Sequence, residues 1–392
     1  MLKRITNNVL LDNNDTDINN KRIITLSSIS NKNTNNSNIK SNKSNTSHIP
    51  DNLKSIVSTS MQDNTLQRIF PQELDRNIFN EDIPLIMFCG LSNSGKTSII
   101  NVVYNNVPPH ESSLFAPTQH GNIIRTNSNS KLFTSIGIID LPGQGSIQDI
   151  LINEVILSKI SSIVYVIDAQ NEPYTNEISR AKNLFKRAIK ANSNIKIDIF
   201  LHKIDTEIFA VDDFKLEYQR DIYEKISTFI SEDGFEIDIR FHFTSIYDYS
   251  ILEAISKVTQ KIFPYSQILE RLLDLLVVSC RFEKVLLMDI YSRTFLVSDS
   301  SLFDPLGFEL CADILNVITE INDIYNGNNN LSRNISELSC SIQLNTGHTL
   351  YIRSIDNNFV IACIVRNENF DKPYLVNLNV DIFRKVLIMN LI

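Results

Sequence analysis

At Pro84–Asn101 the sequence reads Pro-Leu-Ile-Met-Phe-Cys-Gly-Leu-Ser-Asn-Ser-Gly-Lys-Thr-Ser-Ile-Ile-Asn. The apolar run Leu85–Cys89 predicts a short buried strand, and Lys96–Asn105 predicts an amphipathic helix. Between them lies the pattern Gly-x-x-x-x-Gly-Lys-Thr, which in a strand–loop–helix context is typical of a phosphate-binding loop. The stretch therefore predicts an α/β fold whose first loop holds the phosphate groups of a nucleotide.

The residue types of this loop suit phosphate and metal binding. Gly90 and Gly95 let the backbone turn tightly and point its N–H groups at phosphate oxygens. The N-terminus of the following helix adds the positive end of its dipole. Lys96 can reach the β- and γ-phosphates, and the hydroxyl of Thr97 can coordinate Mg²⁺. A chance glycine-rich turn is the alternative, but such a turn would not require the strand and helix that flank it.

Composition restricts the class of protein. The chain has 392 residues, which suggests two or three domains. Its formal net charge is -8, its pI is ≈ 5.4 and no basic stripe stands out, so we expect no nucleic-acid partner. The 5 cysteines form no Cys-x-x-Cys pair and are expected to be free thiols of a reducing compartment. We find no transmembrane-length apolar run, signal peptide or lipidation motif, and expect membrane contact only through a partner.

Sequence pattern divides the chain into three parts. Residues 1–80 are rich in Asn, Ser and Thr, which predicts a disordered extension, although Thr65–Phe79 could form an ordered lead-in. Residues 81–264 alternate apolar runs with amphipathic segments, which predicts a mostly parallel sheet with helices on both faces. Ligands of such sheets bind beyond the carboxyl ends of the strands. We expect strands at Leu85–Cys89, Leu132–Asp140, Ser162–Asp168, Ile195–His202 and Arg240–Thr244, and helices at Lys96–Asn105, Glu177–Ala191, Phe214–Glu232 and Ile251–Phe263.

Residues 265–392 have a different pattern, which predicts a separate α+β domain with an antiparallel sheet. No titratable cluster marks this part as catalytic, and antiparallel sheets often pair through a face or an edge. This part could therefore pair with a second chain. The expected helices are Ser266–Ser279, Phe308–Tyr325 and Val380–Leu391, and the expected strands are Val285–Asp289, Thr294–Ser298, Ser339–Leu344, Thr349–Ser354 and Phe359–Arg366.

A second motif, Asp140-Leu-Pro-Gly143-Gln144, follows an apolar strand. The Asp140 carboxylate can hold the Mg²⁺ shell, and the Gly143 backbone N–H can approach a γ-phosphate because glycine has no Cβ. Gln144 is placed where its amide could orient an attacking water, so it is the candidate catalytic residue. The alternative is an ordinary Pro-Gly turn after a strand. The phosphate-binding loop elsewhere in the sequence favours the nucleotide-binding interpretation over this alternative.

Three further elements complete the candidate site. Thr118, in the loop after the first helix, could close over the γ-phosphate with its hydroxyl on Mg²⁺, or could be a solvated turn residue. Asp205, in His202-Lys-Ile-Asp205, can accept two N–H bonds from guanine, and the stem of Lys203 can lie along the purine face. The turn Thr244-Ser-Ile246 could contact the base through main-chain amides.

In this order the motifs resemble those of a Ras-like small GTPase. His202 stands where the Ras-like base motif has Asn, and this substitution resembles the Rag GTPases, best their RagC/RagD branch. The same resemblance is carried by Tyr165-Val-Ile-Asp-Ala-Gln170, Gln219-Arg-Asp221, Phe243-Thr-Ser-Ile-Tyr-Asp248 and Val297-Ser-Asp-Ser-Ser301. The similarity covers roughly residues 83 to 392.

The resemblance implies a P-loop Ras-like GTPase domain followed by a roadblock (profilin-like) domain, with GTP or GDP and Mg²⁺ as cofactors. It implies a heterodimer with a RagA/RagB-like GTPase, held together by the C-terminal domains. It also implies signalling of amino-acid sufficiency to the TOR kinase complex, a GTPase-activating protein, and a lipidated scaffold complex. That scaffold would tether a cytoplasmic protein to the cytosolic face of the lysosomal or vacuolar membrane.

Two departures from the Ras pattern bear on the site. Ser92 and Asn93 stand where Ras-like loops often have Gly, and His202 is expected to remove one tie between the base motif and the phosphate loop. A nucleotide-binding structural subunit with little hydrolysis is an alternative, and a P-loop ATPase or small-molecule kinase is another. The predicted nucleotide ligands are Gly90, Ser92, Asn93, Ser94, Gly95, Lys96, Thr97, Ser98, Thr118, Gly143, His202, Lys203, Asp205, Ser245 and Ile246, and the predicted Mg²⁺ ligands are Thr97, Thr118 and Asp140.

Overall fold

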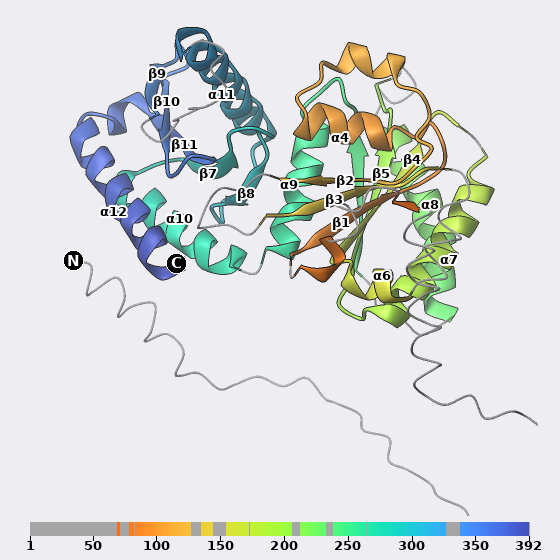
Figure 1. The fold of residues 1–392 in the computed structure, drawn as a ribbon. Coiled ribbons are helices and arrows are strands. Elements are labelled where there is room, and N and C mark those ends of the chain that lie inside the picture. The colour runs from red at the N-terminus through yellow and green to blue at the C-terminus, as the bar shows by residue number, and fades with distance from the viewer. Residues whose placement is uncertain are drawn as a thin grey trace, which may run out of the picture. The chain divides into compact units, whose positions relative to one another are not determined.

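The computed structural model describes residues 69–70, 78–81, 83–126, 135–143, 154–171, 173–205, 212–232, 238–263, 265–326 and 338–391. All of these residues belong to one unit, Asp51–Ile392. Within them the chain forms two sheets, each packed against helices (Figure 1). The predicted fold class, a mostly parallel α/β sheet followed by an α+β region, is therefore confirmed.

The first sheet has 6 strands in the order β2-β3-β1-β4-β5-β6. Neighbours from β3 to β6 run parallel, whereas β2 is antiparallel to β3 at the edge. The sequence analysis did not predict β2, whose side chains are only half-buried and lack the apolar run of a central strand. The strands are β1 (Leu85–Cys89), β2 (Asn122–Arg125), β3 (Gly137–Asp140), β4 (Ser162–Asp168), β5 (Lys196–His202) and β6 (Ile239–Thr244).

Helices cover both faces of this sheet because successive strand residues point to opposite sides. On β1, Leu85 and Met87 pack toward α6, α7 and α8, while Ile86 and Phe88 pack toward α4 and α9. All five β1 residues are buried, as expected for a central parallel strand. The helices are α4 (Lys96–Tyr104), α6 (Glu154–Lys159), α7 (Thr175–Ala191), α8 (Asp212–Glu232) and α9 (Ser250–Ile262).

The second sheet is antiparallel, with 5 strands in the order β8-β7-β11-β10-β9. Helices α10 and α12 cover one face and α11 covers the other. Helix α12 begins at Pro373, earlier than predicted, because proline suits the first turn of a helix. The elements are α10 (Ser266–Cys280), β7 (Lys284–Asp289), β8 (Phe295–Ser298), α11 (Pro305–Asn326), β9 (Ser339–Gln343), β10 (His348–Ser354), β11 (Phe359–Arg366) and α12 (Pro373–Leu391).

The two sheets share a buried cluster that crosses residue 264. Ser256 on α9 and Phe295 on β8 are both buried there, and the Phe295 backbone N–H donates to Ser256 Oγ at 2.9 Å. Upstream, Phe70 is buried against the first sheet, and the Gly121 N–H donates to the Ile69 carbonyl at 2.8 Å. These two residues belong to Thr65–Phe79, which the sequence analysis placed in the extension as a possible ordered lead-in. The exact domain boundaries stay predictions.

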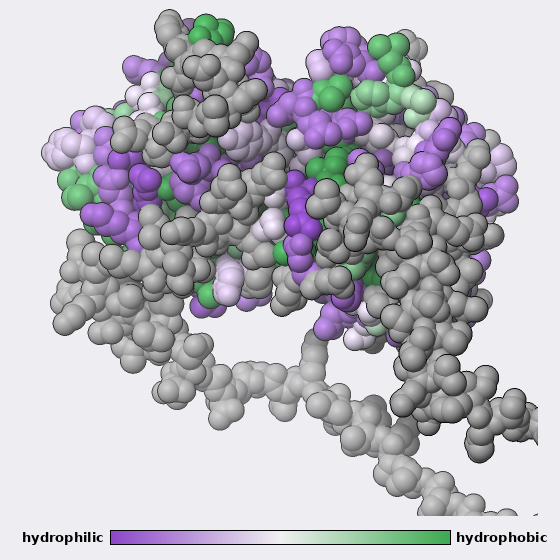
Figure 2. Space-filling model, in the orientation of Figure 1, coloured by the Kyte–Doolittle hydropathy of each residue, from purple (hydrophilic) through white to green (hydrophobic). Residues whose placement is uncertain are grey.

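The surface of the described part contains both hydrophilic and hydrophobic residues. In the view of Figure 2, hydrophobic residues form separate patches within a largely hydrophilic surface. Among the described helices, none combines the length and the apolar character needed to cross a bilayer.

Candidate functional site

A pocket of ≈ 400 Å³ lies beyond the carboxyl ends of the parallel strands. This is the position that the parallel topology predicts for a ligand. The predicted residues that line it are Ser92, Asn93, Gly95, Lys96, Thr97, Ser98, Thr118, Gly143, His202, Lys203, Asp205 and Ile246. Gly90, Ser94, Asp140 and Ser245 are not in the lining but contact residues that are. Gln144, the predicted catalytic residue, lies outside the described residues.

The phosphate loop depends on its glycines. Gly90 has φ 142° and Gly95 has φ 99°, backbone conformations that residues with a Cβ rarely adopt. A Cβ on Gly90 would lie 2.3 Å from the carbonyl oxygen of Val166 on β4. The loop therefore lies directly on the sheet, and its turn leads into α4, where the Ile99 N–H donates to the Gly95 carbonyl at 2.8 Å.

Lys96 is buried inside this loop. Its ammonium donates to the carbonyl oxygens of Gly90 and Leu91 at 3.1 and 2.6 Å, and to Ser94 Oγ at 3.4 Å. Burial lowers the pKa of Lys96, and the nearby Asp140 carboxylate opposes that shift. The cation is thus held at the floor of the pocket, where phosphate oxygens would be stronger acceptors than the carbonyls.

Three side chains with oxygen atoms converge beside Lys96. The Thr97 hydroxyl donates to Asp140 Oδ2 at 2.6 Å, and the Thr97 and Thr118 hydroxyl oxygens lie 2.6 Å apart. Asp140 Oδ1 is buried and has no partner among the described residues. Burial raises the pKa of Asp140, while the Thr97 hydrogen bond and the Lys96 charge lower it. Hydroxyl and carboxylate oxygens are the ligands that Mg²⁺ prefers, so these residues fit that ion.

Gly143 brings the end of β3 against the phosphate loop. A Cβ at this position would lie 2.1 Å from the backbone nitrogen of Ser92. No other residue type could occupy the position without moving one of the two loops. The close approach explains why the motif after Asp140 contains a glycine.

The opposite end of the pocket is formed by the carboxyl ends of β5 and β6. Asp205 Oδ1 accepts a hydrogen bond from Ser245 Oγ at 3.1 Å. The same hydroxyl accepts the Tyr247 backbone N–H at 3.2 Å, so the turn and the carboxylate position each other. Asp205 and Ile246 both line the pocket, which places a carboxylate acceptor where a base would lie.

His202 is buried between this end and the phosphate loop. Its Nδ1 lies 2.9 Å from Thr244 Oγ1, and a Cβ on Gly95 would lie 2.6 Å from the ring. Burial, aided by the charge of Lys203, lowers the pKa of His202 to about 4, so the imidazole is neutral at pH 7. The ring therefore contacts the phosphate loop, which offsets the tie that the sequence analysis expected to be lost.

Several lining residues were missed by the sequence analysis: Ser112, Ser113, Phe115, Ala116, Pro117, Gln170 and Tyr247. Phe115 is 37% exposed in the loop before Thr118, and an aromatic residue next to a candidate metal ligand was an available signal. Gln170 ends the motif Tyr165–Gln170, which was an available signal, but its place at the pocket depends on the pairing of β4 with β5.

Comparison with known proteins adds independent information. Residues 85–315 match the family described as "Gtr1/RagA G protein conserved region". The chain is similar to Ras-related GTP-binding protein C of Mus musculus, with 33% identity over 308 residues, 78% of this chain and 76% of the relative. It is also similar to GTP-binding protein gtr2 of Schizosaccharomyces pombe, with 34% identity over 302 residues, 75% of this chain and 94% of the relative. Ras-related GTP-binding protein D of Mus musculus is 33% identical over 308 residues, 78% of this chain and 67% of the relative.

Proposed function

Because this chain belongs to the Gtr1/RagA family of G proteins, and within it to the RagC/RagD branch, we propose that it is one subunit of a heterodimeric guanine-nucleotide switch. It is a GTPase that binds GTP and GDP together with Mg²⁺. Its output is a change of partner surface, since loops that contact the γ-phosphate are ordered by GTP and released after hydrolysis.

One observation supports this function above the others. One pocket is lined by Thr97 and Thr118, which form the candidate Mg²⁺ cluster with Asp140, and by Asp205, the candidate acceptor for the base. The cluster lies at the phosphate loop, and the carboxylate lies at the end formed by β5 and β6. A guanine nucleotide needs these two recognition elements at its two ends.

Different residues of this chain have different roles in hydrolysis. Mg²⁺, when bound, supplies positive charge that neutralises the β- and γ-phosphate oxygens. Lys96 is placed to donate to the same oxygens, and Gln144 stays the predicted residue that orients the attacking water. No arginine is among the described residues that line the pocket, and slow hydrolysis by the chain alone is part of the proposal. An activating protein that inserts an arginine would accelerate it by about 10³–10⁵.

The partner subunit is a RagA/RagB-like GTPase. We place the contact on the C-terminal domain, because α11 exposes a row of large apolar residues at helical spacing. Val317, Ile321 and Ile324 are 50%, 48% and 76% exposed, and such a row on one helix is typical of an interface.

The further partners follow from the family and form part of the proposal. We propose that the heterodimer signals amino-acid sufficiency to the TOR kinase complex and responds to a GTPase-activating protein. A scaffold complex would hold it at the cytosolic face of the lysosome or vacuole. The test is cofractionation of the chain with that membrane in cells that have or lack the scaffold.

Nucleotide selectivity tests the core of the proposal. The purified chain should bind GTP much more tightly than ATP or XTP, whereas Asp205→Asn should weaken GTP binding and favour XTP, since the carboxylate is the acceptor for guanine. Asp221→Asn, an exposed carboxylate on α8 that is paired with Lys225, is the matched control. Equal binding of all three nucleotides by the wild type would contradict the function.

A further inference from the structure

The segment Asp168–Gln170, the last residue of β4 and the turn after it, forms part of the pocket wall, although it is outside the predicted binding set. Gln170 lines the pocket, and its backbone N–H donates to Asp168 Oδ1 at 3.0 Å. This turn is the end of the Tyr165–Gln170 signature, to which neither the phosphate site nor the base site assigns a role.

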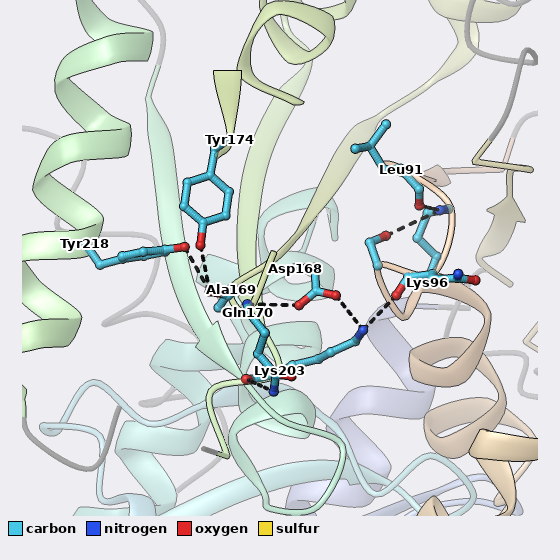
Figure 3. Close-up of polar contacts among 10 residues, drawn as sticks. Leu91, Lys96, Asp168, Ala169, Gln170, Tyr174, Lys203 and Tyr218 are labelled. Atoms are coloured by element: carbon cyan, nitrogen blue, oxygen red, sulfur yellow. Dashed lines mark hydrogen bonds and ion pairs between the residues drawn. The ribbon is translucent and has the colours of Figure 1, made fainter. Parts of the chain in front are cut away.

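The ammonium of Lys203 joins this turn to the phosphate loop (Figure 3). Its Nζ lies 2.6 Å from Asp168 Oδ2 and donates to the Asn93 carbonyl oxygen at 2.8 Å. The Asp168 side chain is 14% exposed and that of Lys203 is 33% exposed, so water screens the pair only in part. One cation thereby connects the base motif, the phosphate loop and the end of β4.

Both ends of this connection have an unusual backbone. Lys203 has φ 65° and Asn93 has φ 64°, which lies in the left-handed region that residues with a Cβ avoid. Neighbouring contacts must therefore hold Lys203 in place. The Gln170 amide donates to the Lys203 carbonyl at 2.9 Å, and the Ala169 N–H donates to the His202 carbonyl at 2.9 Å.

Two tyrosines, one just before α7 and one on α8, form hydrogen bonds with the turn. The hydroxyls of Tyr174 and Tyr218 both donate to the Ala169 carbonyl, at 2.7 and 3.0 Å, and Figure 3 shows them pointing at it. Their rings meet edge to face with centroids 5.0 Å apart. The turn is thus held by the N-cap residue of α7 and by a residue of α8, and the Asp168 carboxylate has a defined position.

We propose that Asp168 is a positioning residue for the base subsite, because its carboxylate holds the Lys203 ammonium against the phosphate loop and so slows nucleotide dissociation. The inference rests on the proposed function, since it assumes a guanine nucleotide in the pocket. The Lys203 stem can lie along the purine face only while the ammonium stays anchored. Without the Asp168 charge, the ammonium loses the partner that keeps it at Asn93.

The first experiment measures the dissociation of a fluorescent GDP analogue from the full-length chain. Asp168→Asn keeps the shape of the side chain and removes its charge, so dissociation should become faster by on the order of tenfold. Gln170→Ala should have a smaller effect in the same direction, and Asp168→Glu should restore part of the wild-type rate. Asp221→Asn, which removes an exposed carboxylate paired with Lys225 at 2.6 Å, should dissociate like the wild type.

A second experiment separates positioning from general stabilisation. In a Lys203→Met background, Asp168→Asn should not accelerate dissociation further, because the carboxylate acts through the ammonium. An equal acceleration in both backgrounds would overturn the inference, as would a wild-type rate in Asp168→Asn alone. Failure of the wild type to bind the GDP analogue would instead overturn the proposed function, so the two failures can be told apart.

Discussion

The hydroxyl of Thr97 lies 2.6 Å from Oδ2 of Asp140, although the two residues are 43 positions apart in the chain. The first lies in the first turn of α4 and the second ends β3. They meet because β1 and β3 are parallel neighbours, which places the phosphate loop and the motif after β3 at the same edge of the sheet.

Removing the Thr97 hydroxyl should therefore uncouple nucleotide binding from Mg²⁺. In Thr97→Ala the Asp140 carboxylate loses its neighbour and the ion loses a ligand, so metal affinity should fall by at least about tenfold. GTP affinity measured with Mg²⁺ and with EDTA should then differ little in the variant and strongly in the wild type. Thr319→Ala is the control, because the hydroxyl that it removes donates to carbonyl oxygens of its own helix, α11. If Mg²⁺ raised the GTP affinity of Thr97→Ala as much as that of the wild type, the metal site would be contradicted.

Glu177 provides a pH prediction. Its carboxylate is buried on α7 and accepts no hydrogen bond from a described residue, and burial, aided by the charge of Asp168, raises its pKa to about 7. Because the folded pKa exceeds the unfolded value, this group favours folding at low pH, and that contribution is lost as pH rises through about 7. Glu177→Gln should therefore raise the melting temperature at pH 8 by roughly 3 °C or more and have little effect at pH 5.

Thermal unfolding at the two pH values is the measurement, and Glu217→Gln, an exposed carboxyl on α8, is the control. Destabilisation by Glu177→Gln at pH 8 would show that the ionised carboxylate has a favourable partner in the folded chain.

Ser256 provides a test of the shared core. Its buried hydroxyl accepts the Phe295 N–H at 2.9 Å and donates to the Leu252 carbonyl at 2.6 Å. Ser256→Ala leaves that N–H buried without an acceptor, so the free energy of unfolding should fall by about 1–3 kcal/mol. Urea unfolding measures the change. Ser279→Ala, which removes an exposed hydroxyl from α10, should change stability by less than about 0.5 kcal/mol, and equal effects would refute a special role for Ser256.

The exposed row on α11 provides a test of the dimer. Ile324→Asp places a charge among Val317 and Ile321, and a buried unpaired charge is strongly unfavourable in an interface. The variant should therefore lose most of its copurification with a RagA/RagB-like subunit while keeping its GTP affinity. Leu216→Asp changes an exposed leucine on α8 in the same way and should leave the heterodimer intact. Wild-type copurification by Ile324→Asp would exclude this face.

Local sequence was sufficient for the fold class, and it named the candidate site residues, whose roles stay predictions. The Gly90–Thr97 loop, the motif from Asp140 to Gly143 and the pair Lys203 and Asp205 could be predicted because each depends on residue types at short fixed spacing. Continuous apolar runs likewise located the central strands, because a parallel strand covered by helices is buried on both faces.

Tertiary structure decided which of these segments meet. The edge strand β2 owes its position to pairing with β3, and the contacts of His202 with Gly95 and of Lys203 with Asp168 and Asn93 join residues far apart in sequence. Such contacts depend on strand order and on the packing of helices, which spacing along the chain does not encode. For that reason the sequence determined the chemistry available to this protein, and the fold determined which groups act together.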